Sequence, residues 1–121
     1  MKYMLLIYGN QAEAQAEMQK LTDEQQQAQM QEWFTFADEA QAAGVLLNYD
    51  GFAPVTASTT VRVRDDKTLI TDGPFAETHE QLAGFYLMDC KDLDDAIHWA
   101  AKIPGAKKGS IEIRPLWNTR T

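Results

Sequence analysis

The sequence is poor in cysteine and in long apolar runs, and both shortages restrict where the protein works. Its single cysteine, Cys90, has no partner for an intrachain disulfide, so nothing in the composition indicates an oxidising compartment. The apolar segment near the start, Met4 to Tyr8, is too short for a signal peptide or a membrane span. We therefore expect a cytoplasmic protein that does not enter a membrane.

Positive charge is also scarce. Eleven Lys and Arg residues stand against eighteen Asp and Glu, which leaves a net charge of −7. An acidic surface repels the phosphate backbones of nucleic acids. The densest basic clusters are small: Arg62 with Arg64, and Lys102 with Lys107 and Lys108. We predict that nucleic acid is not a partner.

The sequence patterns that hold cofactors and metals are absent as well. No glycine-rich phosphate-binding loop occurs, and no pair of histidines stands four residues apart. His79 with Glu77 and Glu80 offers the residue types of metal ligands without the spacing of a metal motif. We expect neither a cofactor nor a metal.

What is present fits one α+β domain that spans residues 1–121. The predicted elements, in chain order, are a strand over 2–8, a helix over 22–43, a strand over 45–52, a hairpin over 59–71, a strand over 82–88, a helix over 93–103 and a strand over 110–116. Residues 10–21, rich in Gln, Ala and Glu, are interpreted as a polar connector or a poorly anchored helical turn.

This order of elements is a split βαβ duplication with an inserted β-hairpin, the ferredoxin-like arrangement. Two helices cover one face of such a sheet and leave the other apolar face open. A second copy of the chain is the simplest cover for that face. The count of layers therefore predicts a homodimer.

Aromatic residues at helical and strand spacing predict part of the core. The helix over 22–43 carries apolar residues three and four positions apart, and Trp33 and Phe34 belong to this stripe. We expect both in the core. Phe85 and Tyr86 are neighbours on a strand, so alternation places them on opposite faces, with Phe85 expected in the core.

The stretch from Thr71 to Asp89 carries the strongest functional signal. A polar turn, D-G-P-F at residues 72–75, leads into ionisable residues and then into an apolar strand. Polar side chains on a loop beside a core strand are a common way to build a small-molecule site. We expect Phe75, Tyr8 and Tyr86 to line an apolar cleft there and to contact a small ligand.

Three ionisable residues of this stretch are candidates for chemistry. Asp72 is either a turn residue that accepts amide hydrogen bonds or a general base and ligand anchor. Glu77 is either a solvated charge that pairs with Arg62 or Arg64, or a second carboxylate in a shared binding pocket. His79 is either a surface residue or a proton shuttle near neutral pH.

Several segments of the chain resemble one protein family. They are Asp72 to Thr78 (D-G-P-F-A-E-T), Gln81-Leu82, Gly84 to Tyr86, Asp92 to Ala96 and Ile111 to Pro115. Together they resemble the DGPF branch of the YCII-related domain family. The resemblance implies a ferredoxin-like fold that dimerises sheet to sheet into an α/β barrel, with a cleft lined by the DGPF loop.

Two functions are open at this point. The first is a small-ligand-binding or regulatory domain with its cleft beside the DGPF loop. The alternative is a cofactor-free enzyme that performs acid–base chemistry on a small organic substrate through Asp72 and His79. Some members of the resembling family carry a histidine on the first helix, proposed to pair with an aspartate, and Thr22 to Ala43 contains no histidine. This difference favours the binding function.

Overall fold

An antiparallel sheet organises the fold. The computed structural model describes residues 1–117, in which the sheet has the strand order β2 (Leu46–Gly51), β5 (Gln81–Asp89), β1 (Lys2–Gly9) and β6 (Ser110–Pro115). β1 lies between β5 and β6, and β2 pairs with the outer side of β5. This is the strand order of the ferredoxin-like split βαβ arrangement, and it confirms the predicted α+β class.

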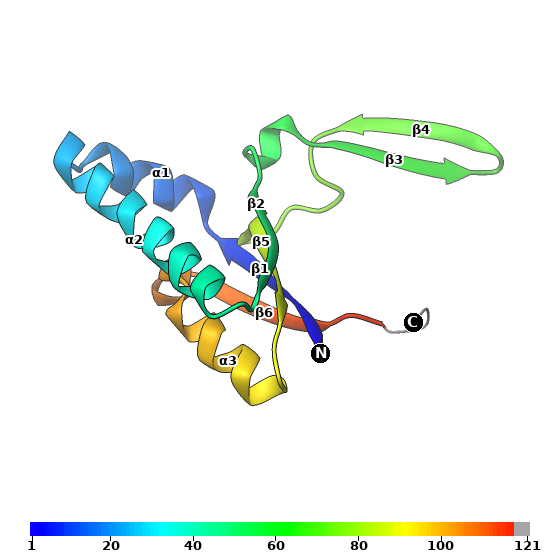
Figure 1. Cartoon of the computed structure of the whole chain (residues 1–121). Helices are drawn as coiled ribbons and strands as arrows, with labels where there is room; N and C mark the ends of the chain where they lie inside the picture. Colours follow the sequence, from blue (N-terminus) through cyan, green and yellow to red (C-terminus); the bar gives the residue numbers. More distant parts are fainter. Residues whose placement is uncertain (118–121) are drawn as a thin grey trace.

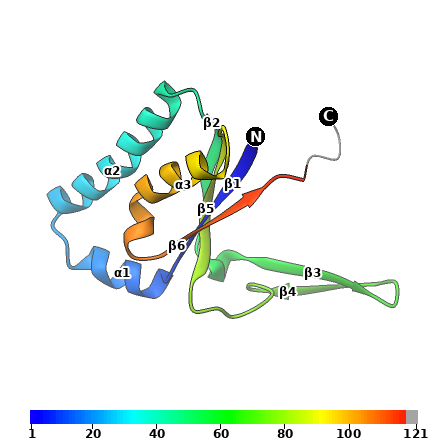
Figure 2. The same cartoon turned by 90° about the horizontal axis from the view of Figure 1, so that it is seen from below.

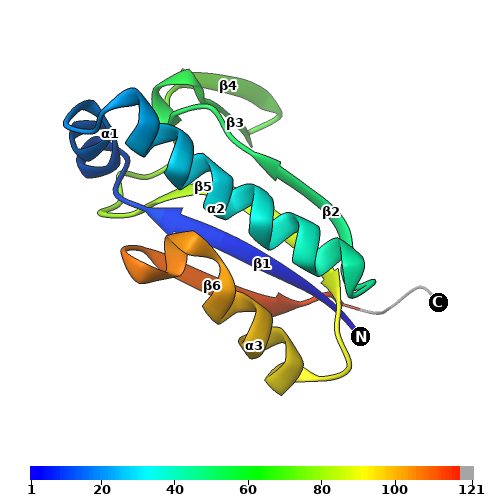
Figure 3. The ribbon, with the colours of Figure 1, turned by 60° about the vertical axis from the view of Figure 1, so that its left-hand side comes forward.

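The helices lie on one face of this sheet. α2 (Asp23–Ala42) and α3 (Leu93–Lys102) pack across it, and α1 (Gln11–Gln19) precedes α2 (Figures 1 and 3). Seen from below, the helices stand on one side of the strands, and no helix of residues 1–117 covers the other side (Figure 2). None of the described helices is long and apolar enough to cross a membrane.

Local hydrogen bonds set the start of α2. The Thr22 hydroxyl accepts a hydrogen bond from the Gln25 amide at 3.2 Å, and the Gln25 side chain accepts one from the Thr22 amide at 3.0 Å. This reciprocal pair is a capping box, which satisfies two amides that have no partner inside the helix. Gly44 follows the helix with a φ of 74°, a conformation that strongly favours glycine.

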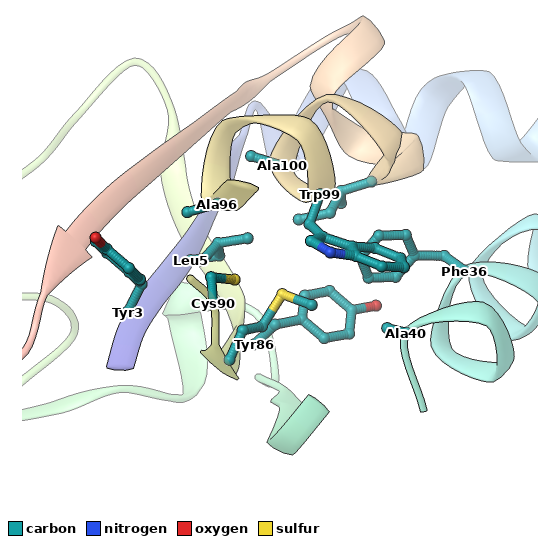
Figure 4. Packing of buried hydrophobic residues seen from close by; sticks show 11 residues of the cluster. Tyr3, Leu5, Phe36, Ala40, Tyr86, Cys90, Ala96, Trp99 and Ala100 are labelled. Atoms are coloured by element: carbon teal, nitrogen blue, oxygen red, sulfur yellow. The ribbon is translucent and has the colours of Figure 1, made fainter. Parts of the chain in front are cut away.

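The core lies between the helices and the covered face of the sheet. Phe36 from α2 meets Tyr86 from β5 edge to face at 4.9 Å between ring centroids, and Trp99 from α3 at 6.1 Å (Figure 4). Burial raises the pKa of the Cys90 thiol in this cluster. The buried apolar residues are Tyr3, Leu5, Phe36, Ala37, Ala40, Tyr86, Met88, Cys90, Ala96, Trp99, Ala100 and Ile103.

The expected core position of Phe34 is wrong. Its side chain is 56% exposed, whereas Phe36 is buried and Trp33 packs partly buried against the core. Successive helical residues are rotated by about 100°, so the neighbours Trp33 and Phe34 cannot both point at the sheet. α2 turns the face with Trp33, Phe36 and Ala40 inward, and Phe34 lies on its flank.

Residues 11–19 form a complete helix, α1, instead of a connector or a single turn. The Asn10 side chain caps it by accepting a hydrogen bond from the Glu13 amide at 2.9 Å, and an ion pair joins Glu17 to Lys108. No residue of α1 is buried. Its helical state therefore rests on capping and on the high helix propensity of Ala, Gln and Glu, which outweigh the lack of an apolar stripe.

The predicted hairpin is confirmed as a separate sheet of β3 (Thr59–Arg64) and β4 (Lys67–Asp72). Its two-residue turn, Asp65-Asp66, has positive φ angles of 51° and 60°. Positive φ at both central positions is the requirement of a type I′ turn, and Asp tolerates it without glycine. A short 3₁₀ turn, η1 (Val55–Ala57), connects β2 to this hairpin.

Candidate functional site

The DGPF turn begins where β4 ends, and the contacts that hold it do not use the Asp72 carboxylate. The Gly73 amide donates to the Ser58 carbonyl at 2.7 Å, and the Thr60 hydroxyl donates to the Gly73 carbonyl at 2.8 Å. Gly73 has a φ of 99°, which favours glycine. Among residues 1–117 no hydrogen bond reaches the exposed Asp72 carboxylate, so of the two roles predicted for this side chain the turn-stabilising one has no contact to support it.

The other predicted residues of the loop are also exposed. Phe75 is 78% exposed, and its carbonyl accepts a hydrogen bond from Arg62 at 3.3 Å. Glu77 and His79 lie further along the loop with exposed side chains. In the described chain, neither makes an ion pair with the other or with Arg62, so the loop presents its charges separately to solvent.

A network of amide side chains anchors the loop to the sheet. Gln81 donates to the Thr78 carbonyl at 2.7 Å and accepts from the Gln11 amide at 2.9 Å. The Gln11 side chain in turn accepts from the Val55 amide at 3.1 Å, and Asn10 donates to the His79 carbonyl at 3.1 Å. The start of α1 therefore fixes both η1 and the loop, and His79 contributes its backbone to this network.

The loop ends on the uncovered face of the sheet. The Glu80 carboxylate accepts a hydrogen bond from the Ser110 hydroxyl on β6 at 2.8 Å. Ser110 is paired with Tyr8 on β1, and Tyr8 is paired with Leu82 on β5. Paired residues in an antiparallel sheet share a face. Glu80 thus connects the foot of the loop to the face that carries Tyr8.

We call this uncovered side of the sheet the open face. Its middle is apolar because β1 and β5 alternate, with Leu5 and Tyr86 on the helix side and Leu6 paired with Phe85 on the other. Its β6 edge is polar. The open face consists of Met4, Leu6, Tyr8, Asn48, Asp50, Leu82, Phe85, Leu87, Ser110, Glu112 and Arg114.

Tyr8, Glu112 and Arg114 form a cluster on this face. Arg114 donates to the Glu112 carboxylate at 2.7 Å. This hydrogen bond is the main reason why the pKa of Glu112 is lowered, and it raises the pKa of Arg114. Partial burial raises the pKa of the Tyr8 phenol, and the Glu112 carboxylate beside it raises it further. The cluster offers a neutral hydroxyl, a carboxylate and a guanidinium with donors to spare.

Phe85 and Tyr86 lie on opposite faces as alternation predicts, but the expected core position of Phe85 is wrong. Tyr86 is in the core, 5% exposed, and stacks on Tyr49 at 5.6 Å between ring centroids. Burial is the main cause that raises the pKa of Tyr86 to about 12. Phe85 lies on the open face, 6.0 Å from the ring of Phe52. Side chains of β5 alternate between the two faces as predicted, but the helices pack on the face that carries Tyr86 and not on the face that carries Phe85.

The surface of the described residues is hollowed at two places that bear on the predicted site. One, of about 350 Å³, is lined by polar and apolar residues of α2, among them Glu39 and Phe36, and by Lys102, Pro104 and Lys107. The other, of about 270 Å³, is lined by Ile7, Trp33, Tyr49, Asp50, Gly51, Ala83, Gly84, Phe85 and Tyr86. Neither includes Asp72, Phe75, Glu77 or His79. In residues 1–117, His, Cys, Asp and Glu side chains form no group of three that suits a metal ion.

Comparison with known proteins places this chain in a family. The model of the YCII-related domain matches residues 1–120. The chain belongs to the YCII-related domain family. An uncharacterised protein of Rhizobium meliloti (strain 1021) is 36% identical over 118 residues, which is 96% of this chain and 92% of the relative. Neither description names a ligand or a reaction. The family model covers the YCII-related domain as a whole, so membership of the DGPF branch stays a prediction from the D-G-P-F-A-E-T motif.

Sequence reasoning missed most of the open-face cluster in this YCII-related chain. Glu112 and Arg114 alternate with Ile111 and Ile113 on the last strand, which indicated that they point away from the core. A charged side chain that points away from the core on an edge strand is usually exposed to solvent and has no functional neighbour. Only the pairing of β6 with β1 shows that they lie beside Tyr8.

Proposed function

We propose that this YCII-related protein is a small-ligand-binding domain of the DGPF branch that acts as a homodimer. The open faces of two copies pack against each other, and the ligand lies at the Tyr8 end, beside the DGPF loop. The observation that carries the proposal is the composition of the open face, which is apolar in the middle and polar along β6.

The apolar middle supports the homodimer. Met4, Leu6, Phe85 and Leu87 are each partly exposed, and no described helix lies over them. Two sheets that pack face to face lie about 10 Å apart and bury such residues against each other. Glu112 and Arg114 neutralise one another, so the polar edge adds little repulsion between two acidic chains.

The cluster at the edge supports the ligand. Tyr8 supplies a hydroxyl, Glu112 an acceptor and Arg114 further donors, all next to the apolar surface of Leu6. A few polar groups beside an apolar surface are typical of small-molecule sites. The ligand class that fits is a small organic molecule with an apolar body and an anionic or hydroxylated head.

The acid–base alternative through Asp72 and His79 has less support. An acid and a base that act together need mutual contact or a shared substrate position. Both side chains are exposed, and no hydrogen bond joins them in residues 1–117. We therefore place the ligand-binding role on Tyr8, Glu112 and Arg114 and leave the loop residues Phe75 and Glu77 at the rim.

Light scattering tests the homodimer. At micromolar concentration the wild type is expected to give a mass near twice 13.6 kDa. Leu6→Asn introduces a polar group at the centre of the open face and is expected to shift the protein to monomer. Ile97→Asn, which replaces an exposed apolar residue on α3, is the matched control and should remain dimeric. A monomeric wild type would refute the proposal.

Binding of 8-anilinonaphthalene-1-sulfonate tests the ligand site, because this probe combines an apolar body with an anionic head. Arg114→Gln is expected to weaken binding by about tenfold, the loss of one charge-assisted hydrogen bond. Lys102→Gln, on the helix side, should leave binding unchanged. Equal affinities for the wild type and Arg114→Gln would place the ligand elsewhere.

A further inference from the structure

The hairpin of β3 and β4, residues 59–72, stands away from the rest of the molecule as an arm. Within residues 1–117 its strands pair only with each other, and the arm is fixed at its base by the contacts of Gly73 and Thr60. An isolated two-stranded hairpin is marginally stable in water, and most such hairpins need a surface to pack on. Among the residues that the structure describes, no other helix or strand packs extensively against the arm.

The two faces of the arm differ. Val61 is paired with Ile70, and Val63 lies on the same face, two positions along. Val61 and Val63 are 59% exposed and Ile70 is 69% exposed. The opposite face carries Leu69 paired with Arg62, followed by further basic residues. The first face is therefore an uncovered apolar strip, and the second is mixed.

The arm projects on the same side of the sheet as the open face, opposite to the helices (Figure 2). Strands of six residues extend roughly 20 Å, at about 3.3 Å per residue. A second sheet packed on the open face would lie only about 10 Å away. The outer half of the arm therefore passes beyond the plane of the partner's sheet, beside its edge.

The charge of the arm suits an acidic partner. Three basic residues, Arg62, Arg64 and Lys67, balance three acidic ones, Asp65, Asp66 and Asp72, so the arm is neutral. The whole net charge of −7 belongs to the rest of the chain. Because the arm carries no net charge, a second, acidic copy of the chain does not repel it electrostatically.

We propose that each arm clasps the second copy of the chain in the dimer, with the face of Val61, Val63 and Ile70 packed on the partner. This inference rests on the homodimer of the proposed function. It assigns to the arm a contact that holds the two open faces together and closes the ligand site from the side. The arm is continuous with that interface, because the segment that leads into it leaves β2 beside the open face: the Phe52 amide donates to the carbonyl of Ala83, the neighbour of Leu82, at 2.8 Å.

The test compares two adjacent residues on opposite faces of the arm. Ile70→Ser is expected to raise the dissociation constant of the dimer at least tenfold, measured by sedimentation equilibrium. Leu69→Ser removes a similar apolar side chain from the same strand, so it perturbs the hairpin itself to a similar extent, and it should change the constant less than threefold. Equal effects of the two substitutions, or no effect of either, would overturn the clasp while the dimer stands.

Hydrogen exchange gives a second, independent readout on intact proteins. Amides of residues 61–71 are expected to exchange at least tenfold more slowly in the wild-type dimer than in the Leu6→Asn monomer, because the partner covers the arm. Equal exchange rates in dimer and monomer would also overturn the clasp. A wild type that is monomeric by light scattering would instead refute the dimer, so the two failures are distinguishable.

Discussion

The two faces of the sheet are made by the same strands, but the helices cover one face and leave the other exposed. Leu5 and Leu6 are neighbours on β1, yet Leu5 is fully buried under the helices and Leu6 remains partly exposed on the open face. Phe36 from α2 and Trp99 from α3 pack on the covered face, and no described helix lies over the other (Figure 2). The covered face holds the fold together, and the open face is available for assembly and binding.

This comparison separates stability from function within one element. A substitution on the covered face acts on the folding of each chain, whatever the protein concentration. In the proposed homodimer, a substitution on the open face acts on association, so its effect depends on protein concentration. Matched pairs of residues, one from each face, test this separation.

The largest expected effect comes from Leu5→Ala. Removal of a fully buried leucine costs about 2–5 kcal/mol through lost burial and the cavity left behind. Urea unfolding at low and high protein concentration measures this loss, which is expected to be the same at both. Leu6→Ala, its neighbour, should destabilise less at low concentration and lose the gain in stability that the proposed homodimer gives the wild type at high concentration. If both substitutions behave alike, the two faces do not differ as described.

A smaller effect is expected where β2 joins the sheet. A Cβ at Gly84 would lie 2.7 Å from the carbonyl oxygen of Asp50, too close for an undisturbed backbone. Gly84→Ala is expected to cost about 1–3 kcal/mol by forcing β2 away from β5. Gly51→Ala, on the paired strand, meets its nearest neighbour at 3.9 Å and should be tolerated. Thermal unfolding of both variants decides whether β2 depends on this close approach.

The smallest effect concerns two tyrosines and appears only at high pH. Tyr86 in the core has a pKa of about 12, and Tyr8 on the open face has a raised pKa with burial as its main cause. A raised pKa favours the protonated phenol in the folded state. That stability is complete below pH 10 and is lost as the pH rises through the folded pKa.

Urea unfolding between pH 9 and pH 12 measures this loss. Tyr86→Phe is expected to flatten the decline in the free energy of unfolding, because its phenol can no longer titrate. Tyr8→Phe should flatten it less, since the open face is nearer to water. A steeper decline in either variant would contradict the stated positions of the two rings.

Much of the fold could be predicted from local patterns. The strands, the hairpin and the long helix follow from alternation, from turn residues and from the Thr22–Gln25 capping box, because each of these signals acts within a few residues. α1 was underestimated because its capping by Asn10 outweighs its lack of apolar residues. The prediction for Phe34 was wrong because periodicity gives the spacing of the apolar residues on a helix. It does not decide which of two adjacent apolar residues points at the sheet.

The candidate site was less predictable. The D-G-P-F turn and the ionisable residues after it form a distinctive run in the sequence, but Asp72 and His79 are exposed and make no contact with each other in the structure. Tyr8 was predicted as a ligand contact, and the structure gives it the neighbours Glu112 and Arg114, which are about a hundred residues away in the chain. Sequence spacing cannot detect that kind of neighbourhood.

By itself, the sequence determined the class of the fold, the order of its strands and of the two helices that pack on the sheet, and the presence of a sheet face that these helices leave uncovered. These features depend on short-range periodicity and on a count of layers. Only the tertiary structure decided which face the helices cover, that Tyr86 and not Phe85 enters the core, and that the hairpin projects from the open side. Those outcomes depend on strand register and on the direction in which each connection leaves the sheet, and both are set by contacts between distant parts of the chain.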